Sequence, residues 1–276
     1  MPRNPVFPPG GPQRPAKLRR VNRSFPAMRS VMALVLREMS SRYGRSPGGY
    51  LWAIMEPLGG ILVLSIGFSL LVRTPSLGNS FLLFYATGYL PFQIYMSVSN
   101  AVARSVSYSR ALLFYPAVTW LDAMIARTVL NSLTGLLVTY ILLTGIFVMT
   151  ETRTVIALGP VALSLALAIA LGAGVGAFNC VISGLFKAWE QIWSIAMRPI
   201  FIVSGVFFLY EDMPPNVAAI LWWNPLLHIT GLMRRGIYAT YRADYVSITY
   251  VLAVSLGALA MGLLLMGRFH RKILNE

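Results

Sequence analysis

Few side chains in this sequence are suited to catalysis, and they do not form a catalytic set. His228 and His270 stand before and after the last apolar segment, so a membrane would separate them and they cannot share a metal ion. Cys180 is the only cysteine, which excludes an intrachain disulfide and a cysteine cluster. The sequence has no phosphate-binding loop of the form G-x-x-x-x-G-K-S/T. We therefore expect no catalytic residues, no metal site, no bound cofactor and no ATP hydrolysis by this chain alone.

A cluster of glycines has two interpretations. Gly172, Gly174 and Gly176 resemble a fragment of a dinucleotide-binding fingerprint, but they lie within an apolar stretch that no soluble strand precedes. Gly172 and Gly176 also match G-x-x-x-G, the spacing that lets two membrane helices approach closely. The surroundings favour the second interpretation, a close contact between helices.

Four charged residues interrupt apolar segments, namely Glu56, Asp122, Arg127 and Arg198. Such residues are costly in lipid and usually face protein or water. Arg198 is either a helix-end arginine that reaches toward the headgroups or a cationic residue that meets an anionic substrate. Arg127 is expected to pair with Asp122 or with a headgroup. No carboxylate is expected at the bilayer midplane, which disfavours a proton-driven carrier.

The elements that position these residues are predicted to be membrane helices. Of 276 residues, 57% are hydrophobic and only 12% are charged, about half the roughly 25% usual in soluble domains. Apolar segments near or above the ~20 residues that cross a bilayer lie at about 51–72, 81–102, 121–148, 155–184, 192–210 and 246–267. Because lipid offers no hydrogen-bond partners, the backbone is expected to be helical. The predicted fold class is an all-α membrane protein with six transmembrane helices.

Two further elements are expected at the membrane surfaces. Residues 26–43 predict an amphipathic interfacial helix with an apolar face formed by Met28, Val31, Met32, Val35, Met39 and Tyr43. Residues 211–245 hold two stretches that are too short to span, divided at Asn224-Pro225. We expect two re-entrant helices there, which dip into the outer leaflet between the fifth and sixth spans.

The excess of basic over acidic residues follows from the orientation that we expect for the chain in the membrane. The net charge is +14. Basic residues concentrate before residue 50, after the second and fourth apolar segments and at the C-terminus, which places both termini in the cytoplasm. This uneven distribution of basic residues across the membrane explains the positive net charge, so no nucleic-acid partner is expected. Residues 1–24 are basic and rich in proline, and they predict a disordered cytoplasmic tail outside a transmembrane domain at 25–276. This tail either lies near anionic headgroups or docks to a partner.

Two groups of residues could contact a partner or a cargo. The connector at 103–119 predicts a short helix that offers Leu112, Phe114 and Tyr115 to a partner's groove, or an interfacial helix with no partner. Aromatic residues gather in the second and fifth segments, where they either pack the core or stack on the sugars of a sliding polymer. These aromatics are Tyr85, Tyr89, Phe92, Tyr95, Phe207, Phe208 and Tyr210.

Several motifs, in their order and spacing, resemble the membrane subunits of ABC-2 type exporters, in particular the capsular polysaccharide permeases of the KpsM type. The first group is RYGR at 42–45, GYLWA at 49–53 and EPL at 56–58. The second is SRALLFYP at 109–116, LD at 121–122 and AR at 126–127. The third is RPIF at 198–201, SGVFF at 204–208 and NPLLH at 224–228. The resemblance covers about residues 26–272, and the proline-rich head falls outside it.

This resemblance implies the permease subunit of an ATP-driven exporter that moves lipid-linked capsular polysaccharide across the bacterial inner membrane. It implies a homodimer of permeases and two cytoplasmic ABC ATPase subunits, which would bind the ATP and Mg²⁺. It also implies periplasmic co-polymerase and outer-membrane export proteins that complete the route.

The resemblance further implies three groups of site residues. Those that couple to the ATPase are Arg104, Arg110, Leu112, Phe114 and Tyr115. Those at the interfacial gate are Arg42, Tyr43, Trp52 and Glu56. Those along the substrate path are Tyr85, Tyr89, Phe92, Arg198, Phe207, Tyr210, Arg234 and Arg235.

Other functions stay open at this point. An exporter of O-antigen or of a teichoic-acid-type polymer would share the architecture. An autonomous channel or secondary carrier would need no ATPase, and a membrane scaffold would anchor partners without transport.

Overall fold

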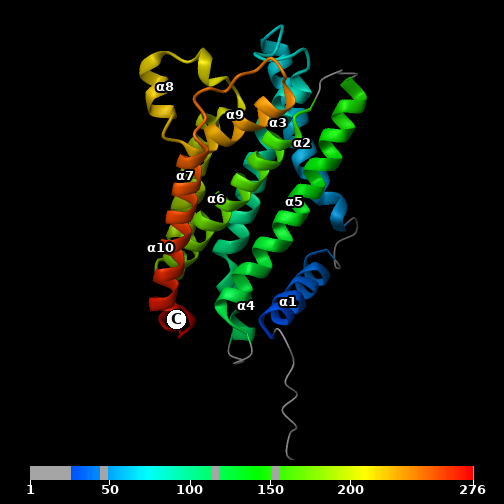
Figure 1. The fold of residues 1–276 in the computed structure, drawn as a ribbon. Coiled ribbons are helices and arrows are strands. Elements are labelled where there is room, and N and C mark those ends of the chain that lie inside the picture. Colours follow the sequence, from blue (N-terminus) through cyan, green and yellow to red (C-terminus); the bar gives the residue numbers. More distant parts are fainter. Residues whose placement is uncertain (1–25, 44–48, 114–117, 151–155, 276) are drawn as a thin grey trace, which may run out of the picture.

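The computed structural model describes residues 26–43, 49–113, 118–150 and 156–275, and within them helices joined by loops are the regular structure, with no strands (Figure 1). The predicted tail at 1–24 lies outside the described residues. The long helices are α2 (Gly49–Leu71), α3 (Phe81–Ala103), α5 (Trp120–Thr150), α6 (Leu158–Leu185) and α10 (Ile248–Asn275). The shorter ones are α1 (Pro26–Tyr43), α4 (Ser105–Leu113), α7 (Trp189–Phe201), α8 (Pro215–Leu221) and α9 (Pro225–Ile237).

Four of the described helices, α2, α5, α6 and α10, are long and apolar enough to cross a membrane. The all-helical fold with several membrane-capable helices is therefore confirmed. Helix α3 is as long as α2 but is not among the four, because polar residues such as Gln93 and Asn100 interrupt it. Helix α7 has only 13 residues and is followed by a π-helical turn to Val206, so the segment expected at about 192–210 is helical over most of its length but is not one continuous α-helix.

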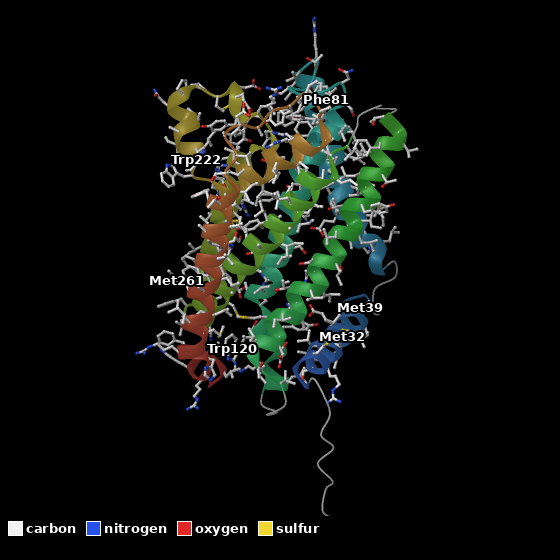
Figure 2. The ribbon with its side chains drawn as sticks, in the orientation of Figure 1. Met32, Met39, Phe81, Trp120, Trp222 and Met261 are labelled. Carbon is white, nitrogen blue, oxygen red and sulfur yellow. The ribbon has the colours of Figure 1, made fainter. Side chains whose placement is uncertain are left out.

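The two ends of the bundle carry different elements (Figure 1). Helices α1 and α4 and the C-terminus lie at one end, and α8 and α9 lie at the opposite end. Figure 2 shows Met32 and Met39 at the first end and Trp222 at the other. The two short helices expected in 211–245 are present as α8 and α9, and Asn224 caps α9 by accepting a hydrogen bond from the Leu226 amide.

The glycines of α6 allow it to pack tightly between α3 and α10. A Cβ on Gly172 would approach the Tyr95 carbonyl oxygen of α3 to 2.9 Å, and one on Gly176 would approach the Ser99 carbonyl oxygen to 2.7 Å. On the facing helix α10, a Cβ on Gly262 would meet the Ala177 backbone at 2.6 Å. The interpretation of these glycines as a helix contact is confirmed, since any side chain there would force the backbones apart.

Helix α1 begins and ends as predicted, but its apolar side chains do not all lie on one face. Leu34 and Val35 are buried against Ala126 and Leu130 of α5. Four other apolar side chains are exposed along α1, and we call them the exposed α1 row: Met28, Met32, Leu36 and Met39. The expected single apolar face is therefore divided, with one part packed on α5 and the methionines turned outward.

The fifth apolar segment ends in a break of the helix. After Phe201 the chain forms a π-helical turn over Ile202–Val206, and Gly205 has a φ of 76°, a left-handed conformation that favours glycine. A Cβ there would also lie 2.7 Å from Leu227 and 2.9 Å from Thr230 of α9. The break releases backbone carbonyl groups from helical pairing, and these groups need other donors.

Helix α9 and its cap supply those donors. Asn224 donates to the Val203 carbonyl oxygen at 3.1 Å, and Thr230 donates to that of Ser204 at 2.9 Å. Arg234 donates through Nη2 to the Val206 carbonyl oxygen at 3.1 Å and through Nη1 to that of Phe208 at 2.9 Å. Its guanidinium also lies 4.2 Å from the centre of the Phe84 ring. Arg234 is thus a buried structural group that holds the broken segment.

This geometry predicts a large difference between two adjacent arginines. Arg234→Met leaves two buried carbonyl groups without donors, so we expect the thermal unfolding midpoint to fall by roughly 5–10 °C. Arg235→Met is the matched control, because Arg235 is exposed and its loss is expected to change stability by no more than about 0.5 kcal/mol. Fluorescence-detected gel filtration after heating compares the two. Equal midpoints in both variants would show that the buried contacts of Arg234 do not stabilise the fold.

Candidate functional site

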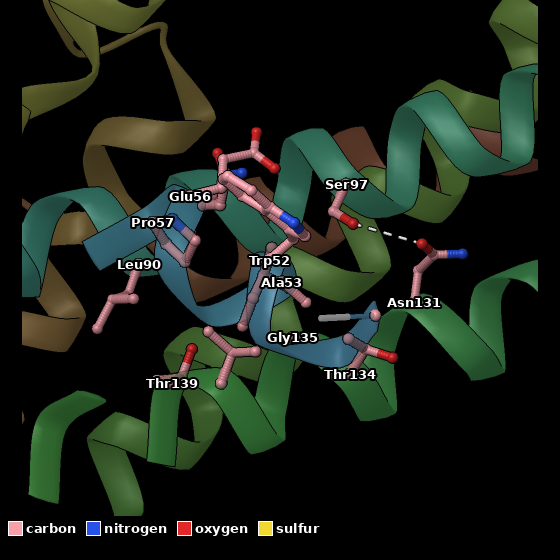
Figure 3. Close-up of a pocket in the computed structure, with 14 residues that line it drawn as sticks. Trp52, Ala53, Glu56, Pro57, Leu90, Ser97, Asn131, Thr134, Gly135 and Thr139 are labelled. Atoms are coloured by element: carbon pink, nitrogen blue, oxygen red, sulfur yellow. Dashed lines mark hydrogen bonds between the residues drawn. The ribbon is translucent and has the colours of Figure 1, made fainter. Parts of the chain in front are cut away.

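A polar cavity opens between α2, α3 and α5 (Figure 3). It has a volume of about 320 Å³ and lies beside a second cavity of about 690 Å³ near α1 and α4. The two share Glu56, Gln93 and Ser97 in their linings. Polar side chains in such number are costly beside lipid, so they mark a candidate functional site.

A buried ion pair forms one wall of the larger cavity. Arg127 Nη2 of α5 lies 3.2 Å from Glu38 Oε1 of α1, and both side chains are about one-tenth exposed. Arg127 also donates to the Ala101 carbonyl oxygen at 3.2 Å, and its guanidinium lies 4.2 Å from the centre of the Tyr108 ring. Because Ala101 is on α3 and Tyr108 on α4, Arg127 joins four helices.

The partner expected for Arg127 was different. Asp122 instead caps the start of α5, where its Oδ2 accepts hydrogen bonds from the Thr119 amide at 2.9 Å and the Thr119 hydroxyl at 2.8 Å. The expected Arg127–Asp122 pair is corrected to Arg127–Glu38. Glu38 is far from Arg127 in the chain and lies in a different helix, so local spacing gave no signal for it.

Helix α4 carries the predicted coupling residues. Arg104 precedes α4, is exposed, and lies 3.6 Å from Glu190. Arg110 is exposed and donates to the Leu274 carbonyl oxygen at 2.8 Å, which ties α4 to the end of α10. Leu112 packs against the Leu34–Ala126 cluster between α1 and α5, so it faces the protein. Phe114 and Tyr115 lie outside the described residues.

The predicted gate residues flank the polar cavity. Trp52 is 64% exposed, and both Trp52 and Glu56 line the smaller cavity. Arg42 and Tyr43 belong to the last turn of α1, and their side chains lie outside the described part of the structure.

Most of the predicted path aromatics belong to one cluster. Phe201, which was not among the predicted path residues, lies at its centre, with ring centroids 4.8 Å from Phe92, 5.1 Å from Phe207 and 6.0 Å from Tyr89. Tyr85 lies 6.5 Å from Phe207. Tyr85 and Phe92 are buried and Tyr89 and Phe207 are partly buried, so the cluster is core packing with a partly exposed edge.

Tyr210 belongs to a different aromatic group, at the end with α8 and α9. Its ring stacks on Tyr245 at 4.2 Å. Burial raises the pKa of the Tyr245 hydroxyl to about 12. The same burial raises the pKa of Tyr241, whose hydroxyl donates to Glu211 Oε2 at 3.0 Å. Both phenols therefore stay protonated near neutral pH.

The three path arginines lie in different environments. Arg198 is exposed on α7 directly before Pro199, and Arg235 is exposed on α9. Arg234 is 2% exposed and engaged with the helix break. In this conformation of the single chain, Arg234 is unavailable to a cargo, which argues for a structural role instead.

His228 connects α9 to the neighbouring loops. Its Nδ1 accepts a hydrogen bond from the Ser247 amide at 3.2 Å, and its Nε2 lies 2.8 Å from the Trp222 carbonyl oxygen. A backbone amide can only donate, so Nδ1 carries no proton and Nε2 donates. Burial lowers the pKa of His228, which keeps the ring neutral.

Comparison with known proteins identifies the family. The sequence profile of the ABC-2 type transporter family matches residues 29–238. The polysialic acid transport protein KpsM of Escherichia coli is 30% identical over 236 residues, which cover 86% of this chain and 92% of the relative.

The chain belongs to the ABC-2 type transporter family.

Two further relatives agree with this membership. The capsule polysaccharide export inner-membrane protein BexB of Haemophilus influenzae is 27% identical over 249 residues. The capsule polysaccharide export inner-membrane protein CtrC of Neisseria meningitidis is 25% identical over 245 residues. Each alignment covers 89% of this chain and 92% of the relative. The predicted resemblance to ABC-2 capsule export permeases is therefore confirmed.

Sequence reasoning missed several residues of the polar cavity. Gln93 and Ser97 on α3 and Asn131 on α5 line it, and Ser97 donates to Asn131 Oδ1 at 3.4 Å. A signal was present, because Gln93, Ser97, Asn100 and Arg104 are spaced three or four residues apart and share one helix face. The candidate site thus extends beyond the predicted aromatics and arginines.

The Glu38–Arg127 pair predicts a strong energetic coupling between α1 and α5. Glu38→Gln or Arg127→Met each leaves a buried charge or polar group without its partner, so each is expected to cost about 3–5 kcal/mol. The double variant is expected to cost less than the sum, with a coupling of about 1–3 kcal/mol. A double-mutant cycle on thermal unfolding of the purified chain measures this term.

The exposed Arg104–Glu190 pair is the matched control for that cycle. Its side chains are 65% and 49% exposed, so solvent screens the charges and the coupling is expected to stay below about 1 kcal/mol. A coupling for Glu38 and Arg127 no larger than that of this control would contradict the buried pair.

The environment of His228 predicts a loss of stability in acid. The unfolded chain takes up a proton at His228 near pH 6.5, whereas the folded chain resists it because its pKa is lowered. The unfolded state therefore binds more protons as the pH falls below about 6.5, and stability decreases by at most about 1.4 kcal/mol per pH unit. His228→Gln keeps a donor for Trp222 but cannot titrate. We expect the drop in melting midpoint between about pH 7.5 and 5.5 to be larger in the unmodified chain, and equal drops would exclude His228 as the titrating group.

Proposed function

We propose that this chain is the membrane-spanning permease subunit of an ATP-driven exporter that moves lipid-linked capsular polysaccharide across the bacterial inner membrane. The observation that carries the proposal is the alignment with proteins named for polysialic acid transport and capsule polysaccharide export over 86–89% of the chain. Membership of the ABC-2 type transporter family supports it.

The proposed topology has six crossings with both termini in the cytoplasm. Helix α3, and α7 together with its π-helical turn, add two crossings to the four long apolar helices. The position of α1, α4 and the C-terminus at one end of the bundle supports this orientation, as does the concentration of basic residues there. Helices α8 and α9 would dip into the outer leaflet, where Trp222 and Trp223 suit the interface.

The proposed assembly pairs two copies of this chain with two cytoplasmic ABC ATPase subunits, which bind ATP and Mg²⁺. Helix α4 would dock to the ATPase through its exposed side, which carries Ser107 and Arg110, together with Arg104 just before the helix. The partly exposed edge of the aromatic cluster, with Arg198 and Arg235, would face the polymer. Periplasmic co-polymerase and outer-membrane export proteins would receive it.

Co-expression with a candidate ATPase tests this function. The complex is reconstituted in proteoliposomes, and lipid-linked polysaccharide is expected to stimulate ATP hydrolysis. Arg110→Glu reverses a charge at the proposed docking surface, so we expect about tenfold less stimulation. Arg271→Glu is the matched control, because it makes the same change at an exposed position near the end of α10 and is expected to retain stimulation.

Three outcomes would contradict the proposal. Flux driven by an ion gradient without ATP indicates a secondary carrier or channel. Stimulation by O-antigen or a teichoic-acid-type polymer but not by capsular polysaccharide moves the cargo to another polymer class. Neither flux nor stimulation, in a complex that assembles, indicates a scaffold.

A further inference from the structure

A third cavity lies between α3, α6 and α7, and we call it the α7 pocket. It has a volume of about 230 Å³ and shares Arg104 with the cavity near α1 and α4. Trp189, Glu190 and Trp193 of α7 line this pocket but neither of the two cavities described above. Because Arg104 directly precedes α4, the pocket lies at the end of the bundle that carries α4 (Figure 1). The α7 pocket therefore holds a set of side chains that the candidate site does not use.

Two tryptophans form an aromatic wall of the pocket. Trp189 and Trp193 are four residues apart on one face of α7, and their rings stack with centroids 6.0 Å apart at an interplanar angle of 28°. Trp189 Nε1 donates a hydrogen bond to Asn179 Oδ1 of α6 at 2.9 Å, which fixes the indole. Both tryptophans are partly buried, so part of each ring remains accessible. Such a wall attracts a cationic group, because the face of a tryptophan ring is electron-rich.

The charged side chains in the lining are Arg104 and Glu190, and they form an exposed ion pair. Arg104 Nη2 lies 3.6 Å from Glu190 Oε2, and the two side chains are 65% and 49% exposed. Solvent screens a pair of this kind, so separating the two charges costs little. Each charge is nevertheless compensated by the other, which disfavours a ligand of a single sign. A ligand that carries both signs replaces this one pair with two, one at each side chain.

The ligand chemistry that fits these features is an ammonium group close to a phosphate. The ammonium group would lie against the Trp193 ring and the Glu190 carboxylate, and the phosphate would accept hydrogen bonds from Arg104. Phosphatidylethanolamine carries such a headgroup. We propose that the α7 pocket binds the headgroup of phosphatidylethanolamine as a site distinct from the path of the transported cargo.

The size and position of the pocket indicate a membrane lipid as the source of this headgroup. Its volume lies below the roughly 300 Å³ at which pockets for drug-sized ligands begin, so it accommodates a headgroup and leaves the acyl chains outside. The opposite face of α7 exposes Ile192 and Ile195, which need a cover of lipid or protein. Tryptophans near the end of a membrane helix are typical of the headgroup region. Free phosphoethanolamine shares the polar contacts but has no chains to pack against α7.

Lipid binding to the purified full-length chain tests the proposal. The chain in detergent is titrated with phosphatidylethanolamine or with phosphatidylglycerol, and native mass spectrometry measures the Kd of the first bound lipid. We expect phosphatidylethanolamine to bind about tenfold more tightly. Glu190→Gln removes the partner of the ammonium group and leaves Arg104 uncompensated. It is therefore expected to weaken phosphatidylethanolamine binding about fivefold and to strengthen phosphatidylglycerol binding, which abolishes the preference.

A second variant tests the aromatic wall. Trp193→Leu keeps an apolar side chain but removes the ring, so we expect phosphatidylethanolamine binding to weaken about threefold while phosphatidylglycerol binding stays unchanged. Asp212→Asn and Trp223→Leu are the matched controls, because they make equivalent changes at exposed positions in the end of the bundle that carries α8. Both controls are expected to bind the two lipids as the unmodified chain does. Gel filtration confirms that each variant is folded.

Three results would overturn the proposal. Equal Kd values of the two lipids for the unmodified chain show that the ammonium group is not recognised. A preference that Glu190→Gln retains, or that Asp212→Asn loses to the same extent, places the bound lipid elsewhere on the chain. Soluble phosphoethanolamine that displaces the lipid at equimolar concentration excludes the lipid as the source of the headgroup. Because neither ATPase nor polymer is present, none of these results bears on the exporter function, which fails only in the ATPase assay.

Discussion

The fold depends on one constraint, which is that a backbone carbonyl released from a helix within a membrane protein must find a donor in the protein. The π-helical turn after α7 releases such groups between Val203 and Phe208, and Asn224, Thr230 and Arg234 satisfy them from α9. Helix α9 can supply them because Asn224-Pro225 starts it beside the break. Helix α9, the break and the buried arginine are therefore one hydrogen-bonded structural unit.

The same need for a partner applies to the buried charge of Arg127, at the opposite end of the bundle. A buried guanidinium is costly unless it is paired and hydrogen-bonded. Arg127 is satisfied by Glu38, by the Ala101 carbonyl oxygen and by the Tyr108 ring. These partners come from α1, α3 and α4. Helix α1, which otherwise packs mainly on α5, is thereby fixed relative to α4, so these two short helices are held by one side chain.

Sequence patterns predict what depends on composition and local spacing. The apolar runs predicted the long helices, Asn224-Pro225 predicted the division between α8 and α9, and the G-x-x-x-G spacing predicted the close packing of α6. Patterns could not predict pairings between distant residues. Asp122 is the nearer partner for Arg127 along the helix, but it is used at the cap of α5, and the contact with Glu38 exists only once α1 docks. Likewise, nothing local distinguishes Arg234 from Arg235, since burial separates them only after α9 packs on the break.

Helix α3 shows that the hydropathy of a segment is an incomplete guide to whether the segment lies inside the helix bundle. It is surrounded by α2, α5, α6 and α9, so lipid does not select its residues, and it tolerates Gln93, Ser97 and Asn100. Helix α2 is different, because Leu62, Val63, Ile66 and Leu70 are exposed and must be covered by lipid or by a second copy. A polar residue on an enclosed helix is retained only where it is satisfied by protein, water or ligand. The polar residues of α3 therefore lie along the cavities beside α5, while the outer face of α2 is apolar.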